Sequence, residues 1–462
     1  MKSISGLAIP VIAGSAMAFD AYEGYTIYNP INGQFSHQTT LIDNTGQVIQ
    51  QWDGADSIAS TPYLLPGGEL MRPCRANGPM NGAAKGGRIQ HFNWDGDILW
   101  DFTFSDSDNQ PHHDICVMPN GNVLMVAWER KTQAEGQAAG RVGLNSEIWP
   151  TQIVEVMPTG PTSGDIVWSW HLWDHLVQDV DPSLPNYGVI SENPGKMDIN
   201  VGNVGQGNSP GDWIHVNALD YHPVLDQIVF SSNRLDEIFI IDHGITTEEA
   251  AGPAGDILYR WGNPSNYQRS GDHVLWNVHG VNWIDPGLPG EENLLLFNNG
   301  NDDNSSDVIE FIPPLLPDGT YALDDDEPWG PVPGDYVFFY ESPDFHGTHL
   351  CGVYKLPNGN YLATDGPNRE IREIEPDGSI AWQHITPANI MRAVKYPFSI
   401  LDPVDEFCPG DVNDDDVVDV NDILAVVGAY GSTDGTGDAD NDGDCDSSDV
   451  LAVLAAWGSD CS

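Results

Sequence analysis

The chain has 462 residues, with 69 acidic side chains against 17 basic ones and a formal net charge of −52. A surface of this charge repels the phosphates of nucleic acid and anionic membranes, so we expect neither as a partner. The length exceeds what one ordinary core holds, which predicts one large repeat fold followed by an accessory module.

Residues 1–18 have the pattern of a secretory signal peptide. A basic Met-Lys start is followed by an apolar stretch over residues 7–13 and an Ala-Met-Ala cleavage site at residues 16–18. The stretch is too short to span a bilayer, and no later one reaches 18 apolar residues. A buried first strand is the alternative reading. We expect the mature protein to be secreted, periplasmic or displayed at the cell surface.

Two sequence phrases alternate along the chain. The first is a strand, an acidic or glycine turn, and a strand ending near Trp: LIDNTGQVIQQW (41–52), IQHFNWDGDILW (89–100), IVEVMPTGPTSGDIVWSW (153–170), a split copy at 238–261 and IREIEPDGSIAW (371–382). The second follows each first phrase: YLLPGGELM (63–71), VMPNGNVLMVAW (117–128), DYHPVLDQIVFSS (220–232), NWIDPGLPGEENLLLF (282–297) and YKLPNGNYLAT (354–364). Alternating apolar residues around such turns are typical of β-hairpins.

Two hairpins make a four-stranded unit, and about six such units predict an all-β fold, a six-bladed β-propeller over residues 19–402. A pair of β-sandwiches is the alternative. The last repeat lacks its second phrase, and we expect the N-terminal strand near residues 25–28 to complete that blade. The segment 171–212 is an insertion between phrases.

Histidines precede the second phrase in four repeats. They are His112-His113, His215, His279 and His349. A lone histidine is usually structural, but matched positions in a propeller surround one central channel, so we expect these imidazoles to converge. An imidazole near neutral pH serves as a nucleophile or a proton donor.

Basic or amide side chains follow the same phrases: Arg130, Arg234, Arg369 and, in the remaining repeat, Asn299. Guanidinium groups beside histidines favour a tetrahedral oxyanion. Two alternatives stay open: a transition-metal site, for which only Asp114 supplies an adjacent carboxylate, and a channel that binds without catalysis.

The segments HHDICVMPNGNVLMVAWER (112–130), IHVNALDYHPVLDQIVFSSNR (214–234) and NVHGVNWIDPG (277–287) resemble the bacterial arylsulfotransferase (aryl-sulfate sulfotransferase) family, and the likeness extends over about residues 22–400. The resemblance implies a six-bladed propeller that moves a sulfuryl group from an aryl sulfate to a phenol through a transiently sulfated histidine, with no nucleotide cofactor.

By motif match, the resemblance implies that His279 is the nucleophile and that His215 and Arg234 bind the sulfate oxygens. His112 or His113 would assist the leaving phenolate by proton donation or hydrogen bonding. We expect His349, Arg130, Arg369 and Asn299 to complete the substrate pocket.

After a linker at 403–407, residues 408–462 contain no Lys or Arg and carry two copies of one motif. The loops DVNDDDVVDVND (411–422) and DADNDGDCDSSD (438–449) each precede an apolar helical segment. Their spacing matches the oxygen ligands of an EF-hand-type calcium loop. The expected ligands are Asp411, Asn413, Asp415, Asp419 and Asp422 with the Val417 carbonyl, and Asp438, Asp440, Asp442, Asp446 and Asp449 with the Asp444 carbonyl.

Aspartate at the last loop position resembles a type I dockerin. The resemblance implies a cohesin-like protein partner, which contacts loop positions 10 and 11, and Ser447-Ser448 match the usual hydroxyl pair there. A stability or sorting tag and a solvated acidic tail are the alternatives.

Overall fold

The computed structural model describes residues 21–205, 209–300, 305–322 and 329–403, together with residues 410, 412–413, 417–432, 436–439, 445 and 447–457 of the C-terminal segment. The chain divides into two compact units, residues 1–400 and 401–462. The expected signal peptide lies outside the described residues. Among the described residues, no helix is long and apolar enough to cross a membrane.

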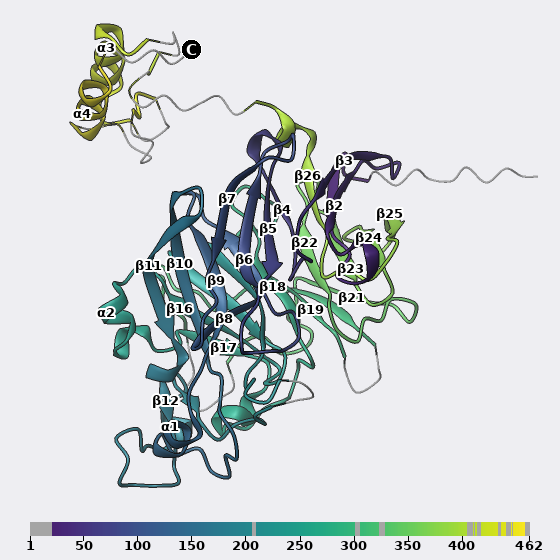
Figure 1. Ribbon diagram of the computed structural model, residues 1–462, viewed down its shortest axis with the longest axis vertical. Helices are drawn as coiled ribbons and strands as arrows, with labels where there is room; N and C mark the ends of the chain where they lie inside the picture. The colour runs from purple at the N-terminus through teal and green to yellow at the C-terminus, as the bar shows by residue number, and fades with distance from the viewer. Residues whose placement is uncertain are drawn as a thin grey trace, which may run out of the picture. The chain divides into compact units, whose positions relative to one another are not determined.

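The first unit is a six-bladed β-propeller, as predicted (Figure 1). Each blade is a four-stranded antiparallel sheet. From the innermost strand outward, the blades are β4(Tyr63–Leu65) β5(Glu69–Arg75) β6(Gly87–Phe92) β7(Ile98–Thr103); β8(Asn109–Val117) β9(Val123–Glu129) β10(Thr151–Gly160) β11(Ser163–His171); β14(Val216–His222) β15(Gln227–Ser232) β16(Glu237–Asp242) β17(Tyr259–Trp261); β18(His279–Trp283) β19(Leu294–Asn298) β20(Asp307–Phe311) β21(Phe338–Glu341); β22(Gly352–Lys355) β23(Tyr361–Asp365) β24(Glu370–Ile374) β25(Ile380–Ile385); and β26(Val394–Pro397) β1(Gly24–Tyr28) β2(Gln38–Ile42) β3(Val48–Asp53).

The two ends of the chain close the ring in one blade. The N-terminal segment provides the strands β1 to β3, and β26 from the other end pairs antiparallel with β1, with Thr26 opposite Lys395. The sequence predicted that an N-terminal strand completes this blade; in fact the N-terminal segment supplies all but its innermost strand. Four of the six blades therefore begin with the second phrase and end with the first phrase, whereas the blade that starts at β18 has no copy of the first phrase and the closing blade has no copy of the second.

A tryptophan at or near the end of the first phrase joins neighbouring blades. Its indole N–H donates to a backbone carbonyl in the outer loop of the following blade at five places around the ring: Trp52 to Asn93 (3.0 Å), Trp100 to Ser163 (2.9 Å), Trp168 to Ile245 (2.8 Å), Trp261 to Pro331 (3.1 Å) and Trp382 to Asn44 (2.7 Å). Each such bond contributes about 0.5–1.5 kcal/mol net. The recurrence of Trp in the sequence thus reflects one repeated contact between blades.

Additional elements lie between the blade strands. They are the helices α1(Gln133–Ala138) and α2(Thr247–Ala250), and a parallel pair formed by β12(Leu176–Val177) and β13(Met197–Asp198). The helix α1 and the insertion that contains β12 lie side by side, with the Asn186 amide donating to the Ala139 carbonyl (2.9 Å) (Figure 1). This insertion ends at Asp212, directly before the third blade.

The second unit contains the helices α3(Val420–Ala429) and α4(Ser447–Ala455), each of which begins at the tenth position of a predicted loop. Its small core includes Val418, Val426 and Val453. The cysteines 74, 116, 351 and 445 are free thiols.

Candidate functional site

The innermost strands are irregular where they carry the predicted histidines. The pairing register shifts between Pro111 and Ile115 in β8, within residues 216–218 in β14, and within residues 279–282 in β18. His113 and His215 both have φ of 53°, in the left-handed region that costs a non-glycine residue about 1–3 kcal/mol. Such bulges redirect side chains and are frequent beside active sites.

Four of the predicted histidines lie together at this end of the channel. The Nδ1 atoms of His112 and His113 are 2.8 Å apart, and the ring of His113 lies 4.6 Å from that of His215, edge to face. His279 lies near enough to His215 for a positive charge on His215 to lower the pKa of His279. His112 also stacks on Trp128, with ring centroids 4.2 Å apart.

Asp212 connects several of these groups. One carboxylate oxygen accepts from His215 Nδ1 (2.6 Å) and pairs with Arg234 Nη2 (3.0 Å), and the other accepts from the Trp128 indole (3.0 Å). Burial alone would raise the pKa of Asp212, but His215 and Arg234 hold it below its ordinary value. Asp212 is therefore ionised at neutral pH, and His215 presents Nε2 away from it.

His279 is fixed in one tautomer. Its Nδ1 lies 2.8 Å from the Asn277 carbonyl, which can only accept, so Nδ1 carries the proton and Nε2 keeps a lone pair. The side chain of Asn299, which is buried, lies beside His279, and its Nδ2 donates to the Gly347 carbonyl (2.7 Å).

The buried imidazoles are neutral at pH 7. Burial lowers the pKa of His112 and of His279 to about 3, and the nearby charges of His215 and Arg392 lower that of His279 further. Burial, followed by repulsion from the surrounding histidines, also holds the pKa of His113 well below its ordinary value. His112, His113 and His279 thus offer neutral ring nitrogens rather than imidazolium groups.

A buried ion pair lies below the histidines. Arg392 pairs with Asp114 and also donates to the Thr61 hydroxyl (3.0 Å). The Tyr63 hydroxyl donates to Asp114 as well (2.8 Å), and the Leu219 amide completes its contacts (3.3 Å). Asp114, which the sequence offered as a carboxylate for a metal, is therefore neutralised by Arg392. No group of three or more His, Cys, Asp or Glu side chains suited to a metal occurs within the described part of the chain.

A cavity of about 530 Å³ opens beside His215, Asp212 and Arg234. Arg75, the last residue of β5, lines the same cavity from another blade. Burial lowers the pKa of Lys85, and the positive charge of the nearby Arg75 lowers it further. No carboxylate among the described residues pairs with Arg75, so its guanidinium is available to an anionic ligand.

Three of the predicted pocket residues are not brought to this cluster by any contact among the described residues. His349 is exposed and contacts Thr348, and Arg369 is exposed. Arg130 pairs with Glu147 (2.6 Å) at the surface. For His349, its distance in sequence from the inner strand explains the difference. His279 is the first residue of β18 and His215 directly precedes β14, whereas His349 lies three residues before β22.

Sequence reasoning missed Asp212, Arg392 and Arg75. A carboxylate three residues before His215 was a usable local signal for Asp212. Arg392 had none, because it reaches Asp114 only through closure of the ring, 278 positions away in sequence.

The predicted calcium ligands lie in the second unit. Asp422 and Asp449 are fully buried; the Asp422 carboxylate accepts from the amides of Val412 (2.8 Å) and Asp419 (2.7 Å), and that of Asp449 from the Ala439 amide (2.6 Å). Asp419 caps α3, while Asn413, Val417 and Asp438 are described in their loops. The expected ligands outside the described residues are Asp411, Asp415, Asp440, Asp442, Asp444 and Asp446.

Solved structures that resemble this chain include a protein of unknown function from Bacteroides caccae (11% identity, 81% of this chain and 99% of that one, TM-score 0.42). Others are the β-propeller domain of Cps50 (Swd1) from Myceliophteria thermophila (14%, 79% and 90%, TM-score 0.40) and virginiamycin B lyase from Staphylococcus aureus (12%, 79% and 85%, TM-score 0.35). These TM-scores are too low to support any conclusion beyond the strand topology described above.

Among curated proteins, none matches the sequence. The family model of arylsulfotransferase (ASST) matches residues 18–309, more than half of the chain, and the matched segment contains the whole histidine cluster with Asp212, Arg234 and Asn299. The chain belongs to the arylsulfotransferase family.

Proposed function

We propose that the chain is an exported aryl-sulfate sulfotransferase that moves a sulfuryl group from a phenolic sulfate to a phenol through a sulfohistidine, without a nucleotide cofactor. The observation that carries the proposal is the state of His279. It is buried and neutral, and its Nδ1–H is held by the Asn277 carbonyl, so Nε2 carries the lone pair. A neutral imidazole in this tautomer is a competent nucleophile.

In the first half-reaction, His279 Nε2 attacks the sulfur of the donor. The N–S bond forms, the S–O bond to the aryl group breaks, and the electron pair leaves with the phenolate. The His112–His113 pair would assist this departure. Because the pKa of both imidazoles is held low, we assign them hydrogen bonding from a neutral N–H rather than the imidazolium that the sequence also allowed.

Positive charge at the cavity would hold the three sulfuryl oxygens. Arg234 is positioned by Asp212 and His215 lies next to it, while Arg75 faces the same 530 Å³ space from another blade. Fixed donors of this kind stabilise charge that develops in the transition state, by about 2.7–4 kcal/mol for a single donor.

In the second half-reaction, the acceptor phenol oxygen attacks sulfur. The N–S bond breaks and its electrons return to His279 Nε2. The phenol proton needs a base, and His215 suits this role since Asp212 accepts its Nδ1–H and leaves Nε2 free.

Incubation of the full chain with a chromogenic aryl sulfate and a second phenol tests this function. We expect release of the chromogenic phenol only in step with formation of the new aryl sulfate. A propeller that only binds would release no phenol, and a sulfatase would release phenol without an acceptor.

We further propose that the second unit is a dockerin-like module that binds two calcium ions. Burial of Asp422 and Asp449 supports this, because residues 408–462 contain no Lys, Arg or His to balance a buried carboxylate. Bound calcium would supply that charge through the loop oxygens.

The helices of the second unit also support a protein partner of the cohesin type. Each exposes an apolar stripe at matched positions along the helix and just after its end: Leu424, Val427 and Tyr430 for α3, and Leu451, Leu454 and Trp457 for α4. Each of these side chains is more than half exposed. Calcium-dependent binding of a cohesin to the full chain, lost on substitution of Leu451 and Leu454 by Ser, tests this interface.

A further inference from the structure

A second cavity lies at the other end of the axial channel, with a volume of about 510 Å³. Residues from all six innermost strands line it: β4, β8, β14, β18, β22 and β26. His215 directly precedes β14, and Asp220 lies five residues further along the same strand. At about 3.3 Å per residue of extended strand, this places the two sites no more than about 16 Å apart along the channel. The Asp114–Arg392 pair lies between them.

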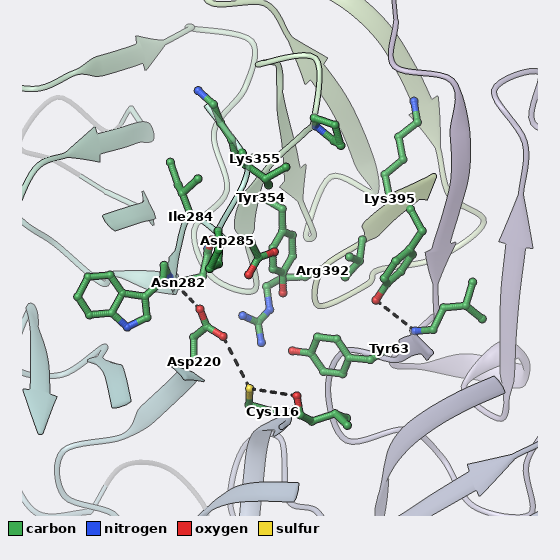
Figure 2. A pocket seen from close by; sticks show the side chains of 18 of the residues that line it. Tyr63, Cys116, Asp220, Asn282, Ile284, Asp285, Tyr354, Lys355, Arg392 and Lys395 are labelled. Carbon is green, nitrogen blue, oxygen red and sulfur yellow. Dashed lines mark hydrogen bonds between the residues drawn. The ribbon is translucent and has the colours of Figure 1, made fainter. Parts of the chain in front are cut away.

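The basic side chains at this cavity are already engaged. Their partners are Glu310 for Lys355 (3.1 Å), Glu373 for Lys395 (2.8 Å) and Asp114 for Arg392. Figure 2 shows the ammonium groups of Lys355 and Lys395 pointing away from the centre of the cavity. These cations therefore leave little positive charge for an anionic ligand.

Two carboxyl groups at the cavity, those of Asp220 and Asp285, are not paired with a basic side chain in the described part of the chain. Asp220 projects toward the centre and accepts from the Trp283 amide (2.8 Å) and the Cys116 thiol (3.7 Å) (Figure 2). Asp285 borders the same space and is exposed to it. Within the described part of the chain, neither forms an ion pair with a basic side chain. A cationic ligand would supply the missing positive charge.

The remaining lining favours an organic cation over a hydrated metal ion. Tyr63, Tyr354 and Tyr396 line the cavity together with the carboxylates, and the other walls are largely aliphatic. Aromatic faces attract ammonium groups when water is excluded. A cavity of 510 Å³ lies in the range of small-molecule sites and has room for a single aromatic ring with a short side chain.

We propose that this cavity binds a small arylalkyl ammonium compound, with its charged group at Asp220 and its ring among the tyrosines. The proposal does not depend on sulfuryl transfer, because it concerns the opposite end of the channel and other residues.

The binding should depend on pH. Burial, followed by the charges of Asp285 and Asp114, raises the pKa of Asp220 to about 8. A bound cation favours the ionised carboxylate, so binding should release a proton and should strengthen between pH 6.5 and 8.5. The other groups that face Asp220 are Cys116 and Asp114 from β8, Asp285 after β18, Tyr354 from β22 and Arg392 before β26.

Calorimetry on the full chain with 2-phenylethylammonium tests the proposal, and 2-phenylethanol serves as the neutral probe of the same shape. At pH 8.5 we expect one site for the cation, binding of the alcohol at least about tenfold weaker, and a similar loss in Asp220→Asn. The exposed Asp285→Asn, which carries little risk to folding, should weaken the cation by about threefold. Asp165→Asn, at an exposed position of β11, is the matched control and should change nothing.

Several results would overturn the proposal. They are no binding of the cation at millimolar concentration, equal affinity for the alcohol, unchanged affinity in both Asp220→Asn and Asp285→Asn, and displacement of the probe by millimolar magnesium, which would assign the carboxylates to a metal ion instead.

Discussion

The two ends of the propeller channel are built from the same six strands and favour ligands of opposite charge. At the histidine end, Arg75 and Arg234 face the cavity, and the buried imidazoles are neutral. At the far end, the basic side chains pair elsewhere, and Asp220 and Asp285 face the cavity. Positions a few residues apart on one inner strand thus line an anion site and a cation site. In this fold, the position along the inner strand decides which cavity a side chain reaches.

The comparison also explains the role of the residues between the two cavities. Arg392 and Asp114 neutralise each other at the boundary. Arg392 still lowers the pKa of His113 and of His279, which helps keep both imidazoles uncharged. The Asp114–Arg392 pair thus lies between the charged groups of the two cavities, and Arg392 favours the neutral, nucleophilic form of His279.

The largest effect of a single charge removal should occur at Asp212. Asp212→Asn would leave His215 without its orienting carboxylate and Arg234 without its anchor, and we expect kcat to fall about 10³–10⁴-fold, as when a histidine loses an orienting aspartate. Steady-state release of a chromogenic phenol measures this. Asp165→Asn is the control, and a fall of less than tenfold in Asp212→Asn would remove this residue from the mechanism.

Removal of the guanidinium groups should have a smaller, graded effect. Arg234→Ala should lower kcat/KM by about 10²–10³-fold if it holds an oxyanion in the transition state. Arg75→Ala should cost about tenfold and mainly raise KM, because this side chain is exposed at the cavity. Equal kinetics for Arg75→Ala and the wild type would show that the sulfuryl group does not contact the β5 end.

The neutral histidines predict an acid-sensitive fold. The pKa of His112 is lowered from about 6.5 in the unfolded chain to about 3, so the unfolded state binds the extra proton first as the pH falls. The stability is fully present above pH 6.5 and is lost as the pH falls toward 3. Between pH 6.5 and 5, one such group costs about 1.5 kcal/mol.

Urea unfolding of the wild type and His112→Asn at both pH values checks this. The difference in unfolding free energy between pH 6.5 and 5 should shrink by about 1.5 kcal/mol in the variant. An unchanged difference would mean that His112 is charged in the folded protein.

Calcium should act on the second unit and barely on the channel. Chelation should remove two ions from the full chain and destabilise the second unit, by about 2.7 kcal/mol for each ion relative to calcium at a hundredfold excess over its Kd. Transfer should stay within about twofold, since the proposed reaction uses no metal. Asp449→Ala should bind one calcium instead of two by calorimetry, and chelation that abolishes transfer would contradict this division of roles.

The sequence predicted the parts of the molecule that repeat. The hairpin phrases, the terminal Trp and the converging histidines all follow from local patterns that recur in each blade. It placed His349 beside the others because it counted histidines before a phrase, without the exact offset from the strand. Asp212 comes from an insertion and Arg392 from the closing blade, so their contacts depend on tertiary closure that no local pattern encodes.

The most direct test of the account is the site of sulfation. The full chain is incubated with an aryl sulfate and no acceptor, and intact mass and peptide mapping follow. We predict one acid-labile sulfuryl group on His279, absent in His279→Asn, which should also lose transfer by at least about 10⁴-fold while it keeps its fold. A sulfuryl group on His215, or transfer by His279→Asn at a rate near that of the wild type, would contradict the assignment of the nucleophile.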